Sequence, residues 1–330
     1  MRQFVPPAVL IAAFLGSAPA ADVPYRVLNK AKVGGAGGFD YVYADSAGRK
    51  LYIPRTGASP RITVFDLDTL KPAGEISNAS AHGAAVSTRS HHGFGSSKPV
   101  VMWDTKTLET IKTIDVEGDP DGIFHDTFND RIYVFSHSAP NATVIDAGDG
   151  SVVGTIDLGG APGQAVGDGK GRVYVDIEDK GNIAVIDVRS MTVTGHYDLK
   201  GNGGACVGLA MDVKTGILFA ACRDPQTMVM VNALNGDLIN TLPIGPGTDG
   251  AVFNPITREA LSANVDGTLT AVKELSPTSY VVQQNLPTMP TAKTLTFDSK
   301  KNHVLLIAAE FSGDPAAMVP DSFTILVVGR

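Results

Sequence analysis

The chain has 330 residues, of which 43% are hydrophobic and 18% are charged, a composition typical of a globular protein. Its 34 acidic and 27 basic residues give a formal net charge of −7, and the sequence contains no run of Lys or Arg. General nucleic-acid binding is therefore not expected, because an acidic surface repels phosphate backbones.

Residues 1–20 have the pattern of a cleaved secretory signal peptide. A short positive segment at residues 1–3 precedes an apolar run at residues 4–15, and Ala18, Pro19 and Ala20 fit a small-x-small cleavage site. An uncleaved anchor is the alternative, although the run is too short for a membrane span, and no later segment is long and apolar enough to cross a bilayer. We therefore expect residues 21–330 to form the mature, soluble protein, located in the periplasm or secreted.

Residues 121–156 contain four short segments rich in Ile, Val, Phe and Tyr, separated by turns rich in Asn, Asp, Gly and Ser. This pattern predicts a four-stranded β-meander. A single meander cannot bury both of its faces. The pattern recurs along the chain with a period of about 40 residues, which is typical of a β-propeller.

Seven copies of the repeat align by their third strand. The aligned segments are ITVFDLDT (62–69), VVMWDTKT (100–107), ATVIDAGD (142–149), IAVIDVRS (183–190), MVMVNALN (228–235), TLTAVKEL (268–275) and FTILVVGR (323–330). The Asp of this strand recurs in four copies and becomes Asn in the fifth, where we expect it to cap a turn. The sequence therefore predicts an all-β fold, a single seven-bladed propeller domain of four-stranded blades over residues 21–330.

The seventh copy has only three strands. Residues 25–33, YRVLNKAKV, precede the first copy and end in a Gly pair, as the third copy does. We expect this N-terminal strand to complete the last blade, which would pair the two ends of the domain and remove an open sheet edge.

The repeats, with LYI and IYV in the second strand and TVFD, TVID and AVID in the third, resemble those of exported bacterial YVTN-repeat (YncE-like) seven-bladed propellers. The resemblance covers essentially all of residues 21–330. The resemblance implies the fold but does not single out one function. Related propellers serve as binding modules, as lactonases and lyases, and as domains of quinone- or haem-dependent enzymes. No catalytic motif of the family matches residues of this sequence.

Cys206 and Cys222 are the only cysteines. Cys206 lies at the start of the first strand of the fifth copy and Cys222 at the end of the second, so the two face each other across a hairpin. An exported protein can keep a disulfide, which is one interpretation. Two buried free thiols are the second, and a thiol catalyst or metal site is the third, which the lack of a CxxC spacing disfavours.

The propeller predicts a site at one mouth of the central channel, where first strands begin and second strands end. The predicted binding residues at the first-strand starts are Asp40, His82, Asp121, Asp249 and Lys293, with Gly163 and Val207 interrupting the set. Those at the second-strand ends are Arg55, His137, Glu178, Arg223, Asn264 and Glu310. A solvated rim of ion pairs and turn caps is the competing interpretation.

Three alternative functions are compatible with this mouth of mixed carboxylates and imidazoles. The first is an exported binding or scaffold protein that holds a small molecule, a metal or an envelope protein, and is not an enzyme. The second is a metal-assisted hydrolase, lactonase or lyase, in which one divalent ion is held by Asp40, His82, Asp121, His137 and Asp249. The third, which rests on the resemblance, is an accessory of a periplasmic quinone- or haem-dependent oxidoreductase.

Other cofactor signatures are absent from the sequence. It contains no CxxCH motif, so covalent c-type haem is excluded, and it contains no P-loop, G-x-S-x-G or HExxH motif. A single closed propeller ring has no need to oligomerise, so we expect a monomer.

Overall fold

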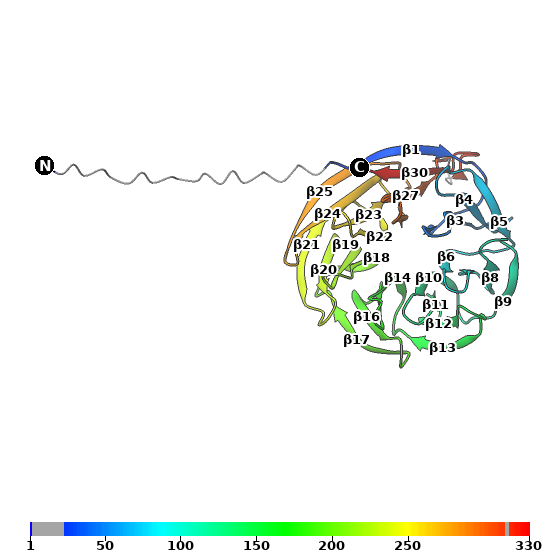
Figure 1. Ribbon diagram of the computed structural model, residues 1–330, viewed down its shortest axis with the longest axis horizontal. Coiled ribbons are helices and arrows are strands. Elements are labelled where there is room, and N and C mark those ends of the chain that lie inside the picture. The colour runs from blue at the N-terminus through cyan, green and yellow to red at the C-terminus, as the bar shows by residue number, and fades with distance from the viewer. Residues whose placement is uncertain (2–22, 314–316) are drawn as a thin grey trace.

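The computed structural model describes residues 1, 23–313 and 317–330. The predicted signal peptide, residues 1–20, lies outside the described residues apart from Met1. Within the described parts, the chain forms seven four-stranded antiparallel sheets arranged as blades around a central channel (Figure 1). The predicted seven-bladed β-propeller is confirmed. No helix in these parts has the length and hydropathy of a membrane span.

The strands follow one another from the channel to the rim within each blade. Blade 1 consists of β2 (Tyr43–Asp45), β3 (Lys50–Arg55), β4 (Arg61–Asp66) and β5 (Pro72–Ser77). Blade 2 consists of β6 (Ala84–Ser87), β7 (His92–Gly95), β8 (Val100–Asp104) and β9 (Thr110–Ile114). Blade 3 consists of β10 (Pro120–Asp126), β11 (Arg131–Ser136), β12 (Asn141–Asp146) and β13 (Val152–Asp157). Blades 4 and 5 consist of β14 (Pro162–Gly167), β15 (Arg172–Ile177), β16 (Asn182–Asp187) and β17 (Thr192–Asp198), and of β18 (Gly204–Asp212), β19 (Ile217–Asp224), β20 (Gln226–Asn232) and β21 (Leu238–Pro243).

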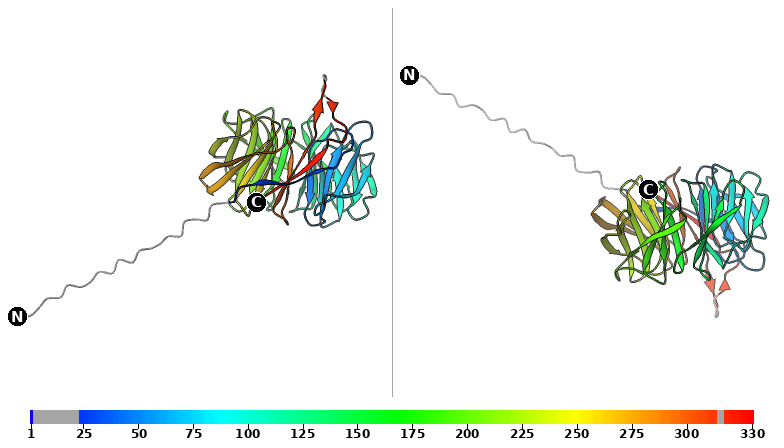
Figure 2. Two further views of the ribbon diagram at one scale, coloured as in Figure 1. Left: turned by 90° about the horizontal axis from the view of Figure 1, so that it is seen from above. Right: turned by 90° about the horizontal axis from the view of Figure 1, so that it is seen from below.

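Blade 6 consists of β22 (Thr248–Asn254), β23 (Glu259–Asn264), β24 (Thr268–Ser276) and β25 (Ser279–Pro287). Blade 7 consists of β26 (Leu295–Asp298), β27 (His303–Ala308), β30 (Thr324–Gly329) and β1 (Arg26–Lys32). Between β27 and β30, a hairpin of β28 (Phe311–Ser312) and β29 (Ala317–Met318) projects from one face of the ring (Figure 2).

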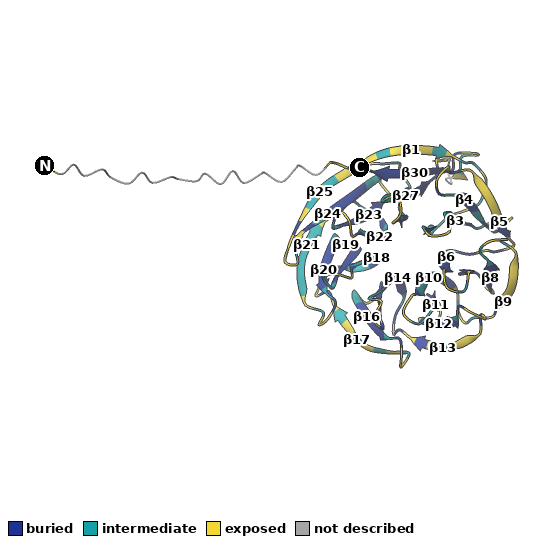
Figure 3. Cartoon of the chain, viewed as in Figure 1, coloured by how far each residue is buried: buried dark blue, intermediate teal, exposed yellow. Residues whose placement is uncertain are grey.

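The hydrophobic core is divided among the interfaces between neighbouring blades. Each of seven clusters of buried apolar side chains in the described chain draws its residues from two adjacent blades, including the pair formed by blades 7 and 1. Fully burying one aliphatic or aromatic side chain contributes about 1.5–3 kcal/mol. The inner strands are buried, and the outermost strands carry the exposed stretches (Figure 3). Each blade therefore depends on both of its neighbours to bury its hydrophobic faces.

The recurring acidic residue of the third strand caps the following turn, as predicted. In β4, Asp66 Oδ1 accepts the backbone N–H groups of residues 68 and 69 at 3.1 and 2.8 Å. Asp104, Asp146, Asp187 and Asn232 accept equivalent bonds in the next four blades. These side chains therefore stabilise the turns that follow the third strands.

The ring is closed by its two chain ends. β1 runs antiparallel to β30, so the predicted strand over residues 25–33 supplies the outer strand of blade 7. Tyr25 anchors it to blade 6: its hydroxyl bonds to Thr257 Oγ1 at 3.0 Å and accepts the Asn254 amide at 3.0 Å. The guanidinium of Arg330 lies 4.7 Å from the centre of the Tyr25 ring and pairs with the fully buried Glu259.

A disulfide joins Cys206 and Cys222, which are directly opposite each other in β18 and β19. Both cysteines are buried. The disulfide interpretation of the sequence is therefore confirmed, and the alternative of two free thiols is wrong. A cross-link that closes a loop of this size stabilises a fold by about 3 kcal/mol.

Replacing Tyr25 tests the closure of the ring. We expect Tyr25→Ala to lower the free energy of unfolding by about 3–5 kcal/mol, because it empties a buried aromatic position and removes two hydrogen bonds. The matched variant Tyr25→Phe keeps the ring and should lose only about 1 kcal/mol. Urea denaturation measures both values, and a loss below about 1 kcal/mol for Tyr25→Ala would contradict the role given to the N-terminal strand.

Candidate functional site

Eight of the eleven predicted binding residues meet at one mouth of the channel, where seven ion pairs link them into a continuous series. We call these eight side chains the mouth ring. In order around the channel they are Glu178, His137, Asp121, His82, Asp40, Lys293, Asp249 and Arg223. Anionic and cationic groups alternate through the series, and every blade contributes at least one member.

One arc of the mouth ring pairs its carboxylates with histidines. His82 Nδ1 lies 3.1 Å from Asp40 Oδ2 and 3.4 Å from Asp121 Oδ1. His137 Nε2 lies 3.5 Å from the second oxygen of Asp121 and 3.5 Å from Glu178 Oε1. Asp121 therefore joins two imidazoles that come from different blades.

The other arc contains permanent cations. Lys293 Nζ lies 4.0 Å from Asp40 Oδ1 and also pairs with Asp249. Asp249 pairs in turn with Arg223, whose Nε donates to the carbonyl oxygen of Thr248 at 2.9 Å. When both imidazoles are protonated, the four carboxylates of the mouth ring are balanced by four cations.

Local irregularities of the inner strands aim these side chains into the mouth. The register between first and second strands shifts at residues 120–123, 162–165, 206–208 and 248–251, which is the mark of a β-bulge. Bulges re-aim side chains at strand ends, and Asp121 and Asp249 lie in two of them. In blade 4 the equivalent residue is Gly163, where an added Cβ would lie 3.3 Å from Glu178 Oε1. Glu178 thus fills the place that Gly163 leaves open.

The mouth ring shifts the pKa values of its members. The hydrogen bond to Glu178 is the main cause that raises the pKa of His137 to about 9, and the bond to Asp40 is the main cause that raises the pKa of His82. Burial, reinforced by the nearby Asp40 carboxylate, raises the pKa of Asp121. The neighbouring carboxylates therefore favour the protonated, positively charged form of both imidazoles.

Tyr41 and Gln164 were missed by sequence reasoning, and both enter the channel below the mouth ring. Burial, followed by the charges of Asp121 and Asp40, raises the pKa of the Tyr41 phenol far above its ordinary value. Both residues line a channel cavity of about 350 Å³. Aligning the first strands could have found them, because they occupy a position that is glycine in four other blades: Gly83, Gly122, Gly208 and Gly250.

Asp176 was also missed, and it lies in β15 two residues before Glu178. Its side chain is fully buried, and neither carboxylate oxygen has a hydrogen-bond partner among the described residues. Burial, with a smaller contribution from Glu178, raises the pKa of Asp176 far above its usual range. Burial therefore favours the neutral form of Asp176.

Three of the predicted residues do not join the mouth ring. Arg55 is only 2% exposed, its Nη2 donates to Gly37 O at 3.0 Å, and its guanidinium lies 3.8 Å from the centre of the Phe323 ring. Asn264 is fully buried and donates to Thr268 and Thr270 hydroxyls. Arg55 and Asn264 are therefore buried and do not lie in the open mouth where they were predicted.

Glu310 is exposed at the base of the β28–β29 hairpin, where its backbone N–H donates to Ser322 Oγ at 3.1 Å. Within the described residues, the Glu310 carboxylate pairs with no member of the mouth ring.

Three of the five predicted metal ligands are close enough to share an ion. One donor atom from each of Asp40, His82 and Asp121 lies within 4.8 Å of the other two. His137 is shared between Asp121 and Glu178, and Asp249 is held by Lys293 and Arg223. Asp249 is therefore neutralised by two cations and lies on the wrong arc for this cluster.

The raised pKa of His137 predicts a pH-dependent contribution to stability. Because about 9 lies above the ordinary value of about 6.5, the ion pairs of His137 contribute fully below about pH 6.5 and are lost as the pH rises through about 9. Between pH 6 and 9.5, we expect the wild type to lose up to about 1 kcal/mol more than His137→Gln, because the side chain is 41% exposed and screened. Equal losses in urea denaturation at the two pH values would contradict this assignment.

Comparisons with known proteins support the fold alone. No family model matches the chain, and no curated protein matches its sequence. Among solved structures, a chain of the mitotic checkpoint complex is similar, with a TM-score of 0.72 and 11% identity over 96% of this chain and 98% of that chain. The WD40 repeats of RRP9 are similar with a TM-score of 0.72 and 12% identity, over 92% of this chain and 97% of that chain. U3-55K is similar with a TM-score of 0.72 and 12% identity, over 93% of this chain and 98% of that chain. The seven-bladed propeller is thus shared with these proteins, and the resemblance to YVTN-repeat propellers stays a prediction.

Proposed function

We propose that the chain is an exported, non-enzymatic binding protein of the bacterial envelope, a propeller scaffold whose mouth ring binds a small molecule or an envelope protein. One observation carries this proposal: all seven blades direct charged side chains into one mouth, and those side chains stay between 11% and 43% exposed. Their alternating charges suit a ligand that presents both signs of charge. A nucleic-acid backbone presents only one sign.

Export is supported by two features of the chain. Residues 1–20 have the signal-peptide pattern, and the Cys206–Cys222 disulfide suits an oxidising compartment such as the periplasm. The binding role is supported by the fold, since propellers place convergent polar groups at a channel mouth without a need for catalysis.

A double substitution in the mouth ring tests this function. The mature protein, beginning at Ala21, is purified from a periplasmic fraction as wild type and as Asp121→Asn/Glu178→Gln, which changes two charges with little change of shape. We expect native mass spectrometry to find a bound molecule on the wild type, or cross-linking from a photoreactive residue at position 119 to capture one envelope protein. The double variant should lose at least about 90% of either signal.

The control places the same photoreactive residue at position 149, an exposed turn on the opposite face. Circular dichroism must show that both proteins are folded. Identical adducts from positions 119 and 149, or adducts that the double variant retains, would contradict binding at the mouth ring.

The Asp40–His82–Asp121 cluster favours a second candidate, a metal-assisted hydrolase, lactonase or lyase. For metal–donor bonds of about 2.1 Å, neighbouring donors lie about 3.0–3.5 Å apart. The separations of 3.1 and 3.4 Å from His82 Nδ1 fit that range. An ion would require neutral His82, so it competes with a proton there. About one equivalent of metal in the purified protein, lost in His82→Gln together with hydrolysis of lactones or esters, would favour this candidate over the first.

A further inference from the structure

Exposed aliphatic side chains gather at turns on the face opposite the mouth ring. First and third strands run away from the mouth, so the turns that follow them lie on this opposite face. In blade 5, the two turns carry Val213 and Leu234. In blade 6, the turn after the first strand carries Ile256, and the end of the third strand carries Leu275. We call these four side chains the aliphatic patch.

The aliphatic patch contains the most exposed apolar side chains of the ring. Among the described residues of the ring, the most exposed large apolar side chains are Leu234 at 76%, Ile256 at 67%, Val23 at 58% and Leu275 at 53%. Three of these four belong to the aliphatic patch, and Val213 is 46% exposed. Single exposed apolar residues are ordinary, but a group of them on neighbouring turns marks an interaction surface.

Hydrogen bonds hold the four turns together. In blade 5, the N–H of Ala233 donates to Gly216 O at 2.9 Å, and in blade 6 the N–H of Glu274 donates to Arg258 O at 2.9 Å. Burial is the main cause that raises the pKa of Glu274, and a hydrogen bond to Asp212 of blade 5 acts in the same direction. Asp212 and Glu274 each directly precede a member of the aliphatic patch, so this contact joins the two blades beneath it.

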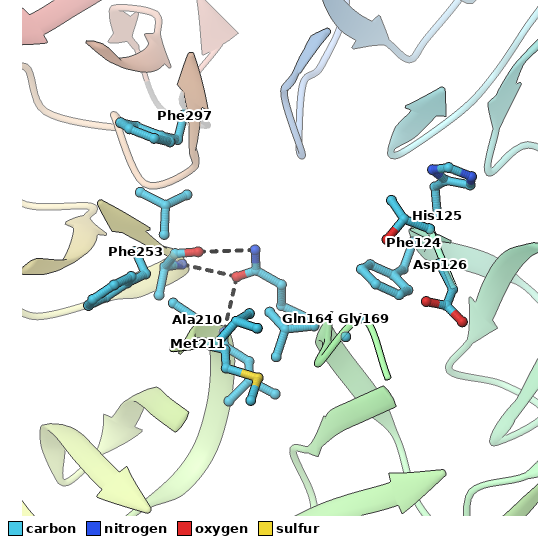
Figure 4. A pocket seen from close by; sticks show the side chains of 16 residues that line it. Phe124, His125, Asp126, Gln164, Gly169, Ala210, Met211, Phe253 and Phe297 are labelled. Carbon is cyan, nitrogen blue, oxygen red and sulfur yellow. Dashed lines mark hydrogen bonds between the residues drawn. The ribbon is translucent and has the colours of Figure 1, made fainter. Parts of the chain in front are cut away.

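Gln164 fixes the spacing of the two inner turns. Its side-chain oxygen accepts the backbone N–H groups of Leu209 at 3.1 Å and Ala251 at 3.0 Å, and its amide nitrogen donates to Ala251 O at 3.1 Å (Figure 4). Leu209 lies in β18 and Ala251 in β22, the strands that lead to Val213 and Ile256. The aliphatic patch is therefore preorganised, and docking on it has little ordering cost.

The chain enters the ring on the same face. β1 runs antiparallel to β30, so it begins where β30 ends, on the face away from the β28–β29 hairpin (Figure 2). Just before β1, Tyr25 is bonded to Thr257, the residue after Ile256. The predicted signal peptide has its apolar run at residues 4–15, so at most about 30 Å of extended chain separates that run from Val23. A bilayer that holds the run before cleavage would therefore lie near the aliphatic patch.

The charges beside the aliphatic patch suit lipid phosphates. Lys214 is exposed, and the Arg258 side chain is 43% exposed. Glu274 accepts a bond from Arg258 at 2.9 Å, but its side chain has no exposed area. In these turns, Asp237 supplies the one carboxylate that is exposed. Cations that flank inserted apolar side chains strengthen binding to anionic lipids.

We propose that the aliphatic patch docks on the surface of a lipid bilayer, with Leu234 and Ile256 inserted among the lipid chains and the flanking cations against the phosphates. Docking of this kind is peripheral and needs no membrane-spanning segment. It leaves the mouth ring turned away from the bilayer and open to its own ligand. The proposal therefore does not depend on what the mouth ring binds.

Vesicle co-sedimentation tests the proposal with the mature protein, which begins at Ala21 and lacks the apolar run. The vesicles contain phosphatidylethanolamine and phosphatidylglycerol at about 3:1. We expect the wild type to sediment with them and Leu234→Gln/Ile256→Gln to bind at least about tenfold more weakly, because two apolar side chains no longer leave water. No sedimentation of the wild type, or equal binding of the two proteins, would overturn the proposal.

The matched control is Ile111→Gln/Val152→Gln. It changes two exposed aliphatic side chains on β9 and β13, the outer strands of blades 2 and 3. This variant should bind vesicles as the wild type does, and circular dichroism must show that both double variants are folded. A loss of binding as large as that of Leu234→Gln/Ile256→Gln would make binding a general property of exposed apolar residues and would contradict docking by the aliphatic patch.

Insertion has its own readout. A tryptophan introduced by Leu234→Trp should be quenched by brominated lipids, and one introduced by Val152→Trp should not, over the constant background of the fully buried Trp103. Equal quenching of the two variants would contradict the orientation. Analytical ultracentrifugation without lipid should show a monomer. A dimer that Leu234→Gln/Ile256→Gln dissociates would assign the aliphatic patch to a second copy of the chain and overturn the proposal.

Discussion

The pairing of β1 with β30 is the constraint on which the rest of the structure depends. A propeller buries its core only between neighbouring blades, so an incomplete blade would expose two interfaces. The N-terminal strand supplies the missing edge, and Tyr25 and Arg330 fix it against blade 6. The mouth ring inherits this closure, since it takes residues from blades that lie far apart in the sequence.

The mouth ring uses that scaffold to combine two kinds of basic group with its carboxylates. At the mouth ring, every carboxylate has a basic neighbour, but the two arcs differ: one contains the imidazoles of His82 and His137, and the other contains the side chains of Lys293 and Arg223.

Much of the fold and part of the site follow from the repeat. Position within the repeat was enough to bring eight residues to one mouth, because first strands start and second strands end on the same face. The repeat does not report what covers a residue. Arg55 occupies an equivalent position, yet the loop at residues 35–37 and Phe323 bury it. The second oxygen of Asp126 is buried without a hydrogen-bond partner among the described residues, which likewise depends on packing that a sequence pattern does not contain.

The most direct test of the mouth ring is an NMR titration of the His82 and His137 imidazoles, assigned with single His→Gln variants. The ion-pair geometry predicts that both midpoints lie above 6.5, that His137 titrates at about 9, and that Glu178→Gln lowers the pKa of His137 while that of His82 changes less. Midpoints near 6.5 for both histidines, or a His137 midpoint that Glu178→Gln leaves unchanged, would contradict the alternating ring of charges.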